Sequence, residues 1–167
     1  YDHVGGIDDL RPFCIFGDIN IYGDEIVTAG LPHTMPYCFP KNAEKLYPGA
    51  PKLKLHTIHP HEHYQIGDIE FVPIGYRFGK FAYITDMKSM GDEEYAYLDG
   101  VETLVINALR FEKTHHSHQL VSDAIEVSRR IGAKHTYFIH VTHQIGFHDE
   151  ANKRLPEGFE FGFDGME

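Results

Sequence analysis

The spacing of apolar and polar residues predicts several short strands followed by an alternation of strands and helices. Residues 64–86 alternate between apolar and polar positions, with Gly-Asp and Gly-Lys turns between them, which is typical of meander strands. The segment VETLVINAL at 101–109 is a continuous apolar run of strand length, so it predicts a central strand buried on both faces. HTYFIHVT at 135–142 predicts a second buried strand.

Helical spacing is clearest in residues 119–133. Its apolar positions are Leu120, Ala124, Ile125, Val127 and Ile131, with Arg129 and Arg130 in the last predicted turn and Gly132 as the stop. Shorter helices are predicted in 91–100 and 146–156, and a final strand in 159–166.

Turn residues divide the first part of the chain. FCIFGDINIYGDE at 13–25 predicts two short strands separated by a Gly-Asp turn. The five prolines of residues 31–51 predict a surface excursion with at most a short helix at 43–47, and LKLHTI at 53–58 predicts a strand. Taken together, the elements predict mixed sheets covered by helices, which is an α/β layered domain.

Composition is typical of one soluble domain, because the chain has 167 residues of which 42% are hydrophobic and 24% charged. No apolar run approaches the roughly 18 residues of a membrane span. The formal net charge of -10 argues against a broad nucleic-acid-binding face, although metal ions could still hold an anionic substrate. Cys14 and Cys38 have no zinc-type spacing and indicate small buried side chains in a reducing, cytoplasmic compartment.

The 13 histidines are the unusual feature, because histidine is the commonest metal ligand and an acid–base group near neutral pH. His59, His61 and His63 stand at alternate positions and could share one face of a strand. Pro60 and Glu62 among them favour a solvated loop instead, and short histidine tracts specify a metal site poorly.

Three further residues lie at positions where functional residues are common, and each position also has a purely structural explanation. Asp86 follows a predicted strand, where functional groups gather, but aspartates there also start turns. His140 lies in a predicted buried strand, so it needs either a core hydrogen bond or a metal ion. His118 precedes the predicted helix and could meet an anion as a general acid, or be a loop residue beside a Ser117 cap.

In this order, the motifs resemble the metallo-β-lactamase superfamily, in particular its phosphodiesterase branch, which includes tRNase Z and the cyclic-phosphate phosphodiesterase of phosphonate breakdown. YDHVGGIDDLRPF resembles the end of the family signature His-x-His-x-Asp-His and its continuation. AYITD resembles the strand that carries the metal-bridging aspartate, and THHSHQLVSDAIEVSRRIGAKHTYFIHVTH resembles the closing segment. LPEGFEFGFDGM resembles the last strand, so the likeness covers nearly the whole chain.

The resemblance implies an αββα sandwich over residues 1–167 and two divalent metal ions, zinc or manganese, in a complete site. It implies these roles: metal ligands Asp2, His3, Asp86 and His140, catalytic residue His118, and substrate-side residues Arg110, His115 and His143. The implied reaction is hydrolysis of a small cyclic or nucleotide-like phosphodiester. A thioester or lactone hydrolase and a non-catalytic metal-binding module remain alternatives, because the superfamily's metal site is chemically permissive.

The expected partner is therefore a small phosphodiester rather than a nucleic acid or a membrane, and a homodimer is left open.

Two parts of the family pattern are missing, so we expect an N-terminally incomplete fold. The paired histidines of the signature do not precede Asp2, and the family expects another metal-binding histidine where Ile74 runs directly into Gly75. Both gaps belong to the first metal site, whereas the ligands named above belong to the second.

Overall fold

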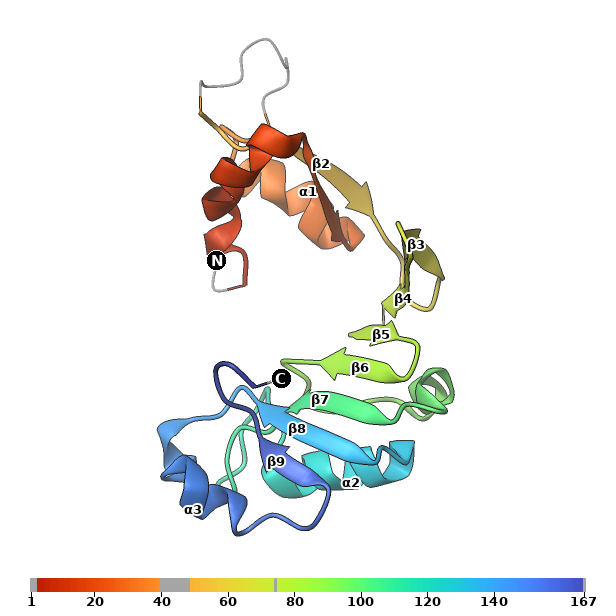
Figure 1. Cartoon of the computed structure of the whole chain (residues 1–167), viewed down its shortest axis with the longest axis vertical. Coiled ribbons are helices and arrows are strands. Elements are labelled where there is room, and N and C mark those ends of the chain that lie inside the picture. Colours follow the sequence, from red (N-terminus) through yellow and green to blue (C-terminus); the bar gives the residue numbers. More distant parts are fainter. Residues whose placement is uncertain (1–2, 40–48, 74, 167) are drawn as a thin grey trace. The chain divides into compact units, whose positions relative to one another are not determined.

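The structure is a computed structural model that describes residues 3–39, 49–73 and 75–166 (Figure 1). The chain divides into two compact units, residues 1–60 and 61–167, and each unit has its own sheet. The described residues combine sheets and helices as an α/β fold, which confirms the predicted fold class. None of the described helices has the length and apolar character needed to cross a membrane.

The first unit is built on two parallel strands joined through a helix. Its elements are the 3-10 helix η1 (Gly5–Phe16), β1 (Ile19–Gly23), α1 (Glu25–Thr34) and β2 (Leu53–Thr57). The strands pair with Ile19 opposite Leu53. Asp24 begins α1 because its side chain accepts a hydrogen bond from the Val27 amide at 2.7 Å, which satisfies a free donor of the first turn.

Two predictions for this unit are wrong in part. The first strand expected in 13–25 is absent from the described structure, because residues 13–16 end η1, while the second is β1. Helix α1 was not predicted, since Gly30 and Pro32 within it normally oppose a helix. The strand expected at 53–58 is confirmed as β2, and the short helix expected at 43–47 lies outside the described residues.

The second unit contains one seven-stranded sheet with the order β3-β4-β5-β6-β7-β8-β9. The strands are β3 (Tyr64–Ile66), β4 (Ile69–Pro73), β5 (Tyr76–Phe78), β6 (Phe81–Ile84), β7 (Thr103–Asn107), β8 (His135–Ile139) and β9 (Phe159–Phe161). Strands β3 to β6 form an antiparallel meander, whereas β6 to β9 run parallel. The parallel half therefore brings the carboxyl ends of β6, β7 and β8 to one edge of the sheet.

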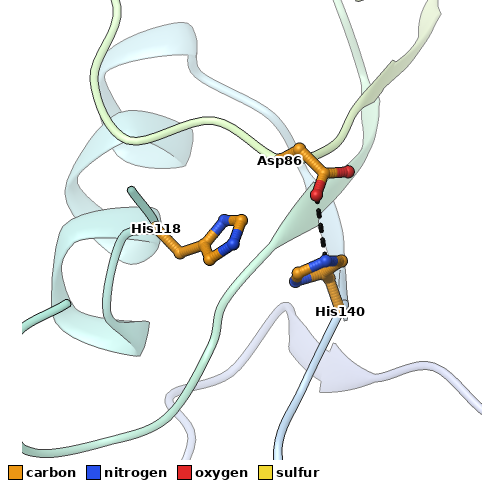
Figure 2. Close-up of side chains that lie close together, drawn as sticks. All are labelled: Asp86, His118 and His140. Carbon is orange, nitrogen blue, oxygen red and sulfur yellow. Dashed lines mark ion pairs between the residues drawn. The ribbon is translucent and has the colours of Figure 1, made fainter. Parts of the chain in front are cut away.

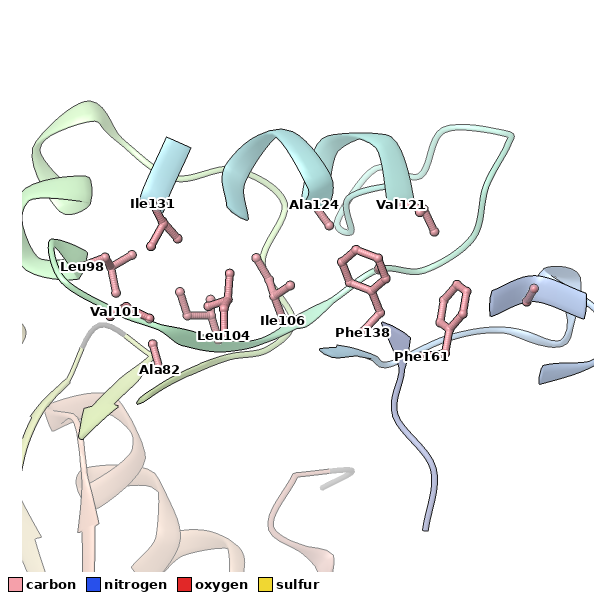
Figure 3. Close-up of a cluster of buried hydrophobic side chains, with 13 residues drawn as sticks. Ala82, Leu98, Val101, Leu104, Ile106, Val121, Ala124, Ile131, Phe138 and Phe161 are labelled. Atoms are coloured by element: carbon pink, nitrogen blue, oxygen red, sulfur yellow. The ribbon is translucent and has the colours of Figure 1, made fainter. Parts of the chain in front are cut away.

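The core of this unit lies between the parallel strands and α2 (Val121–Ile131), as Figure 3 shows. The central buried side chains are Val121, Ala124 and Ile131 from α2, and Leu104, Ile106, Phe138 and Phe161 from the strands. Inside this apolar layer, the Ser128 hydroxyl hydrogen bonds to the Thr136 hydroxyl at 2.6 Å and joins α2 to β8. Burial of alternate strand positions against one helix fixes the register of the sheet.

The predicted elements of the second unit are present, with one correction: His140, expected inside a buried strand, is exposed and follows the end of β8, because its left-handed backbone (φ 54°) leaves the strand. The four meander strands are β3 to β6, the central apolar run is β7, and the second buried run is β8. The helix predicted in residues 119–133 is α2, and Gly132 follows its last turn with a φ of 82°. The shorter helices are the 3-10 helix η3 (Asp92–Leu98) and α3 (His148–Asn152), and the final strand is β9.

Candidate metal centre

Asp86 and His140 both follow the carboxyl ends of parallel strands and both adopt a left-handed backbone conformation. Strand β6 ends at Ile84 and β8 ends at Ile139, directly before His140. The φ angles are 57° at Asp86 and 54° at His140. Residues other than glycine rarely hold such angles, which cost about 1–3 kcal/mol and gather at functional sites. The fold therefore holds these two side chains at the sheet edge against a local backbone strain.

Asp86, His118 and His140 converge there, as Figure 2 shows, with the His118 ring facing the other two side chains. One donor atom from each of the three lies within 4.8 Å of the others. The Nε2 atom of His140 is 2.9 Å from Oδ1 of Asp86, and the rings of His118 and His140 are 4.6 Å apart. Imidazole nitrogen and carboxylate oxygen are the donor types that zinc and similar ions take.

His118 lies three residues before the start of α2, and the surrounding backbone fixes its place. The Lys88 ammonium donates to the His118 carbonyl at 3.1 Å, and the Gln119 amide donates to the Met87 carbonyl at 3.3 Å. The Nδ1 atom of His118 is buried and has no hydrogen-bond partner. An unpaired buried imidazole nitrogen is costly, so this atom indicates that a further group binds at the site. Asp86 and His140 thus fit a divalent ion by donor type and spacing, and His118 lies close enough to contact that ion or a group bound to it.

Asn107 and Gln119 support the site, and sequence analysis did not single them out. Both side chains are buried. The Asn107 side chain makes two hydrogen bonds to the Met87 backbone at 2.9 Å, and the Gln119 amide group donates to the Asn107 carbonyl at 2.8 Å. They therefore join the loop after Asp86 to the loop that carries His118. The sequence feature that could have indicated this role is the position of Asn107, because a polar residue at the end of an apolar strand needs hydrogen-bond partners.

His115 and Arg110 lie on the same loop as His118. The rings of His115 and His118 stack at 5.1 Å with 12° between their planes. Burial, with further contributions from the charges of His116 and His118, lowers the pKa of His115. Arg110 donates to the carbonyls of Lys113 and Thr114 and to the Gln144 side chain, so it binds the loop rather than Asp86 or His140.

The remaining predicted site residues are Asp2, His3 and His143. Asp2 lies outside the described residues, and His3 is an exposed turn residue of the first unit. His143 begins the 3-10 helix η4 (His143–Ile145), and its exposed side chain makes no hydrogen bond or ring contact with Asp86, His118 or His140. The structure therefore joins three of the predicted residues directly and His115 through one ring contact.

The histidine tract at 59–63 has other contacts in the described structure. His63 pairs with Glu70 at 2.9 Å, and the His61 ring stacks on Tyr97 at 4.3 Å. Among the described residues, Asp86, His118 and His140 form the one group of metal-ligating side chains that lies close enough for an ion. These contacts agree with the favoured interpretation of the tract as a solvated loop.

Solved structures of similar fold include a diphosphatase from the PhnP family, which is 30% identical with a TM-score of 0.84. That match covers 97% of this chain and 64% of the diphosphatase. The metallo-β-lactamase fold protein YhfI from Bacillus subtilis matches with a TM-score of 0.70 at 16% identity, over 99% of this chain and 72% of YhfI. The second likeness supports the fold alone.

Among curated proteins, an octanoyltransferase from Porphyromonas gingivalis is 36% identical over 177 residues, which takes in 100% of this chain. The chain spans only 35% of the length of that relative. The family model for the β-lactamase superfamily domain matches residues 1–141. The chain therefore belongs to the metallo-β-lactamase superfamily of metal-dependent hydrolases, as the sequence motifs predicted.

Proposed function

We propose that this chain is the catalytic part of a metal-dependent phosphodiesterase that acts on a small cyclic or nucleotide-like phosphodiester. The observation that carries the proposal is the convergence of Asp86, His118 and His140 at one sheet edge, with their donor atoms within 4.8 Å. The likeness to a PhnP-family diphosphatase supports phosphoester chemistry over the other reactions of the superfamily.

Asp86 and His140 would hold a divalent ion, zinc or manganese, and the resemblance adds Asp2 and His3 to the ligand set. Such an ion supplies an activated water and offsets the negative charge of the phosphate. Asp86 suits a shared position because its two carboxylate oxygens can serve two ions. The second oxygen, Oδ2, accepts a hydrogen bond from the Thr85 hydroxyl at 2.8 Å, which orients the carboxylate.

His118 is proposed to protonate the departing oxygen. Its ring faces the Asp86–His140 pair from the loop before α2, so a phosphoryl group held at that pair would lie beside it. His115 stacks behind His118 and limits the orientations of its ring. Arg110 is proposed to contribute indirectly, because its hydrogen bonds to the loop backbone hold the loop that carries His115 and His118 in place. His143, which makes no hydrogen bond or ring contact with the three, contributes only if substrate reaches η4.

The net charge of -10 supports a small substrate, because a polyanionic RNA would be repelled from most of the surface. We therefore propose a small-molecule partner rather than a nucleic acid. The two cysteines, which indicate a reducing compartment, support a cytoplasmic location. The relevant test is turnover by the full-length protein loaded with Zn²⁺ or Mn²⁺. Bis(p-nitrophenyl) phosphate should be hydrolysed, and Asp86→Asn should abolish the turnover.

A second candidate is hydrolysis of a thioester or a lactone. The observation that favours it is the name of the curated relative, octanoyltransferase, although that name describes a protein of which this chain spans 35%. An octanoyl thioester assayed beside the phosphodiester separates the two candidates. Turnover of the thioester alone would replace the first proposal, and tight metal binding without either turnover would indicate a non-catalytic module.

A further inference from the structure

A pocket of about 380 Å³ lies beside the loop that carries His118. Its lining residues are Arg110, Phe111, Glu112, Lys113, Gln144 and Arg154. Three of the six are cations and one is an acid, so the lining is positive in a chain whose net charge is -10. Electropositive pockets on an acidic protein concentrate anions locally.

The three cations of the pocket are not neutralised by carboxylates. Within the described residues, neither Arg110, Lys113 nor Arg154 forms an ion pair, and Glu112 forms none with them. Elsewhere in the described part of the chain, ion pairs engage six lysine and arginine side chains, namely Arg11, Lys54, Lys80, Arg130, Lys134 and Lys153. The pocket thus keeps positive charge available to an outside anion.

The protein also holds the side chains of Arg110 and Arg154 in position. Arg110 uses Nε, Nη1 and Nη2 for one hydrogen bond each, which leaves two of the five donors of its guanidinium free. The Arg154 guanidinium lies 3.5 Å above the centre of the Phe111 ring. Lys113 adopts a left-handed conformation with φ 63°, which turns the loop back toward Arg110. An anion would therefore meet a largely preorganised set of donors, which reduces the entropy cost of binding.

This pocket connects to the candidate metal centre through the loop itself. Arg110 binds the Thr114 carbonyl at 3.3 Å, and the next residue, His115, stacks on His118. We infer that the pocket formed by Arg110, Lys113 and Arg154 binds a second phosphate group of the substrate, away from the bond that is cleaved. The link to turnover rests on the proposed function, whereas the binding of the anion does not.

The first experiment measures binding alone. The full-length protein, stripped of metal with a chelator and confirmed folded by circular dichroism, is titrated calorimetrically with inorganic phosphate and with pyrophosphate. Arg154→Gln and Lys113→Asn should each weaken pyrophosphate binding by roughly three- to tenfold, the range for losing one partly exposed charged contact. Asparagine is chosen at position 113 because it tolerates the left-handed conformation. Lys153→Gln, which removes the same charge next to the pocket, should change nothing.

The second experiment links the pocket to turnover by the metal-loaded protein. Arg154→Gln should raise KM for a phosphodiester that bears a second phosphate and leave KM for bis(p-nitrophenyl) phosphate unchanged. Equal pyrophosphate affinity in Arg154→Gln, Lys113→Asn and Lys153→Gln would overturn the inference. Absence of all phosphodiester turnover would instead overturn the proposed function, and the titration of the metal-free protein would still decide the pocket.

Discussion

The side chain of Asn107 holds the backbone of Met87 by two hydrogen bonds, donating to its carbonyl and accepting from its amide, each at 2.9 Å. Met87 directly follows Asp86, so the two hydrogen bonds from Asn107 fix the path of the strained backbone at Asp86, just after β6. Asn107→Ala should lower the free energy of unfolding by about 1–3 kcal/mol, because the Met87 amide loses its partner and the Met87 carbonyl keeps only the bond from the Gln119 amide. It should also lower kcat, because Asp86 is no longer held.

Urea unfolding and phosphodiester turnover measure these two effects of Asn107→Ala. Thr103→Val is the matched control, since Thr103 begins the same strand and lies at the opposite end from the site. A variant at Asn107 that unfolds at lower urea yet keeps full kcat per metal-loaded molecule would show that the pair stabilises the sheet without positioning Asp86.

Two substitutions distinguish the effect of the negative charge of Asp86 from the effect of its left-handed backbone conformation. Both Asp86→Asn and Asp86→Ala remove the anionic ligand, so both should lose bound metal in elemental analysis of the purified protein. Alanine is strained at φ 57°, whereas asparagine tolerates this region, so Asp86→Ala should be less stable than Asp86→Asn by about 1 kcal/mol. Asp68→Asn, in the turn between β3 and β4, should keep its metal. Retention of metal by both Asp86 variants would remove Asp86 from the ligand set.

Burial decides which elements could be predicted from the sequence. Helix α2 and strand β7 carry their pattern in residues that pack into the core, so apolar spacing identified both. Phe13, Ile15 and Phe16 are apolar but exposed in η1, with Ile15 80% and Phe16 84% exposed, so their apolar character led to the wrong prediction of a strand. Helix α1 depends on the Asp24 cap and on packing against β1 and β2, which outweigh the poor helix propensity of Pro32.

The candidate site shows a similar division. Asp86, His118 and His140 could be named from motif order, and parallel strands bring such residues to one edge. The hydrogen bonds of Asn107 depend on the register between β6 and β7, which no spacing in the sequence specifies. The pocket of Arg110, Lys113 and Arg154 joins loops far apart in the chain, so it became visible only in three dimensions.

Measurement of bound metal beside kcat distinguishes a proton-donor role of His118 from a metal-ligand role. His118→Ala should lower kcat by about 10²–10⁴, the range for losing a general acid, with metal content unchanged. His116→Ala is the control, because His116 is exposed on the same loop and contacts His115 rather than the Asp86–His140 pair. Loss of bound metal in His118→Ala would make His118 a ligand and would leave the proton donor to be found elsewhere.

His148 should make the stability of the C-terminal region depend on pH. Its Nε2 atom hydrogen bonds to the Phe161 carbonyl at 2.9 Å, and this bond, with help from Asp149, raises the pKa of His148 above its ordinary 6.5. A raised folded-state pKa stabilises the protein fully below the unfolded pKa, and the stabilisation is lost as pH rises through the folded pKa. His148→Gln keeps a donor but cannot be protonated.

The difference in free energy of unfolding between the natural chain and His148→Gln should therefore be largest near about pH 5.5 and shrink toward about pH 8. Urea unfolding at several pH values measures it. Phe147→Leu, a change at the exposed neighbour that does not titrate, should give a difference that is constant with pH. A difference for His148→Gln that grows with pH would mean that neutral His148 makes the stronger bond, so that α3 and β9 are held together without its charge.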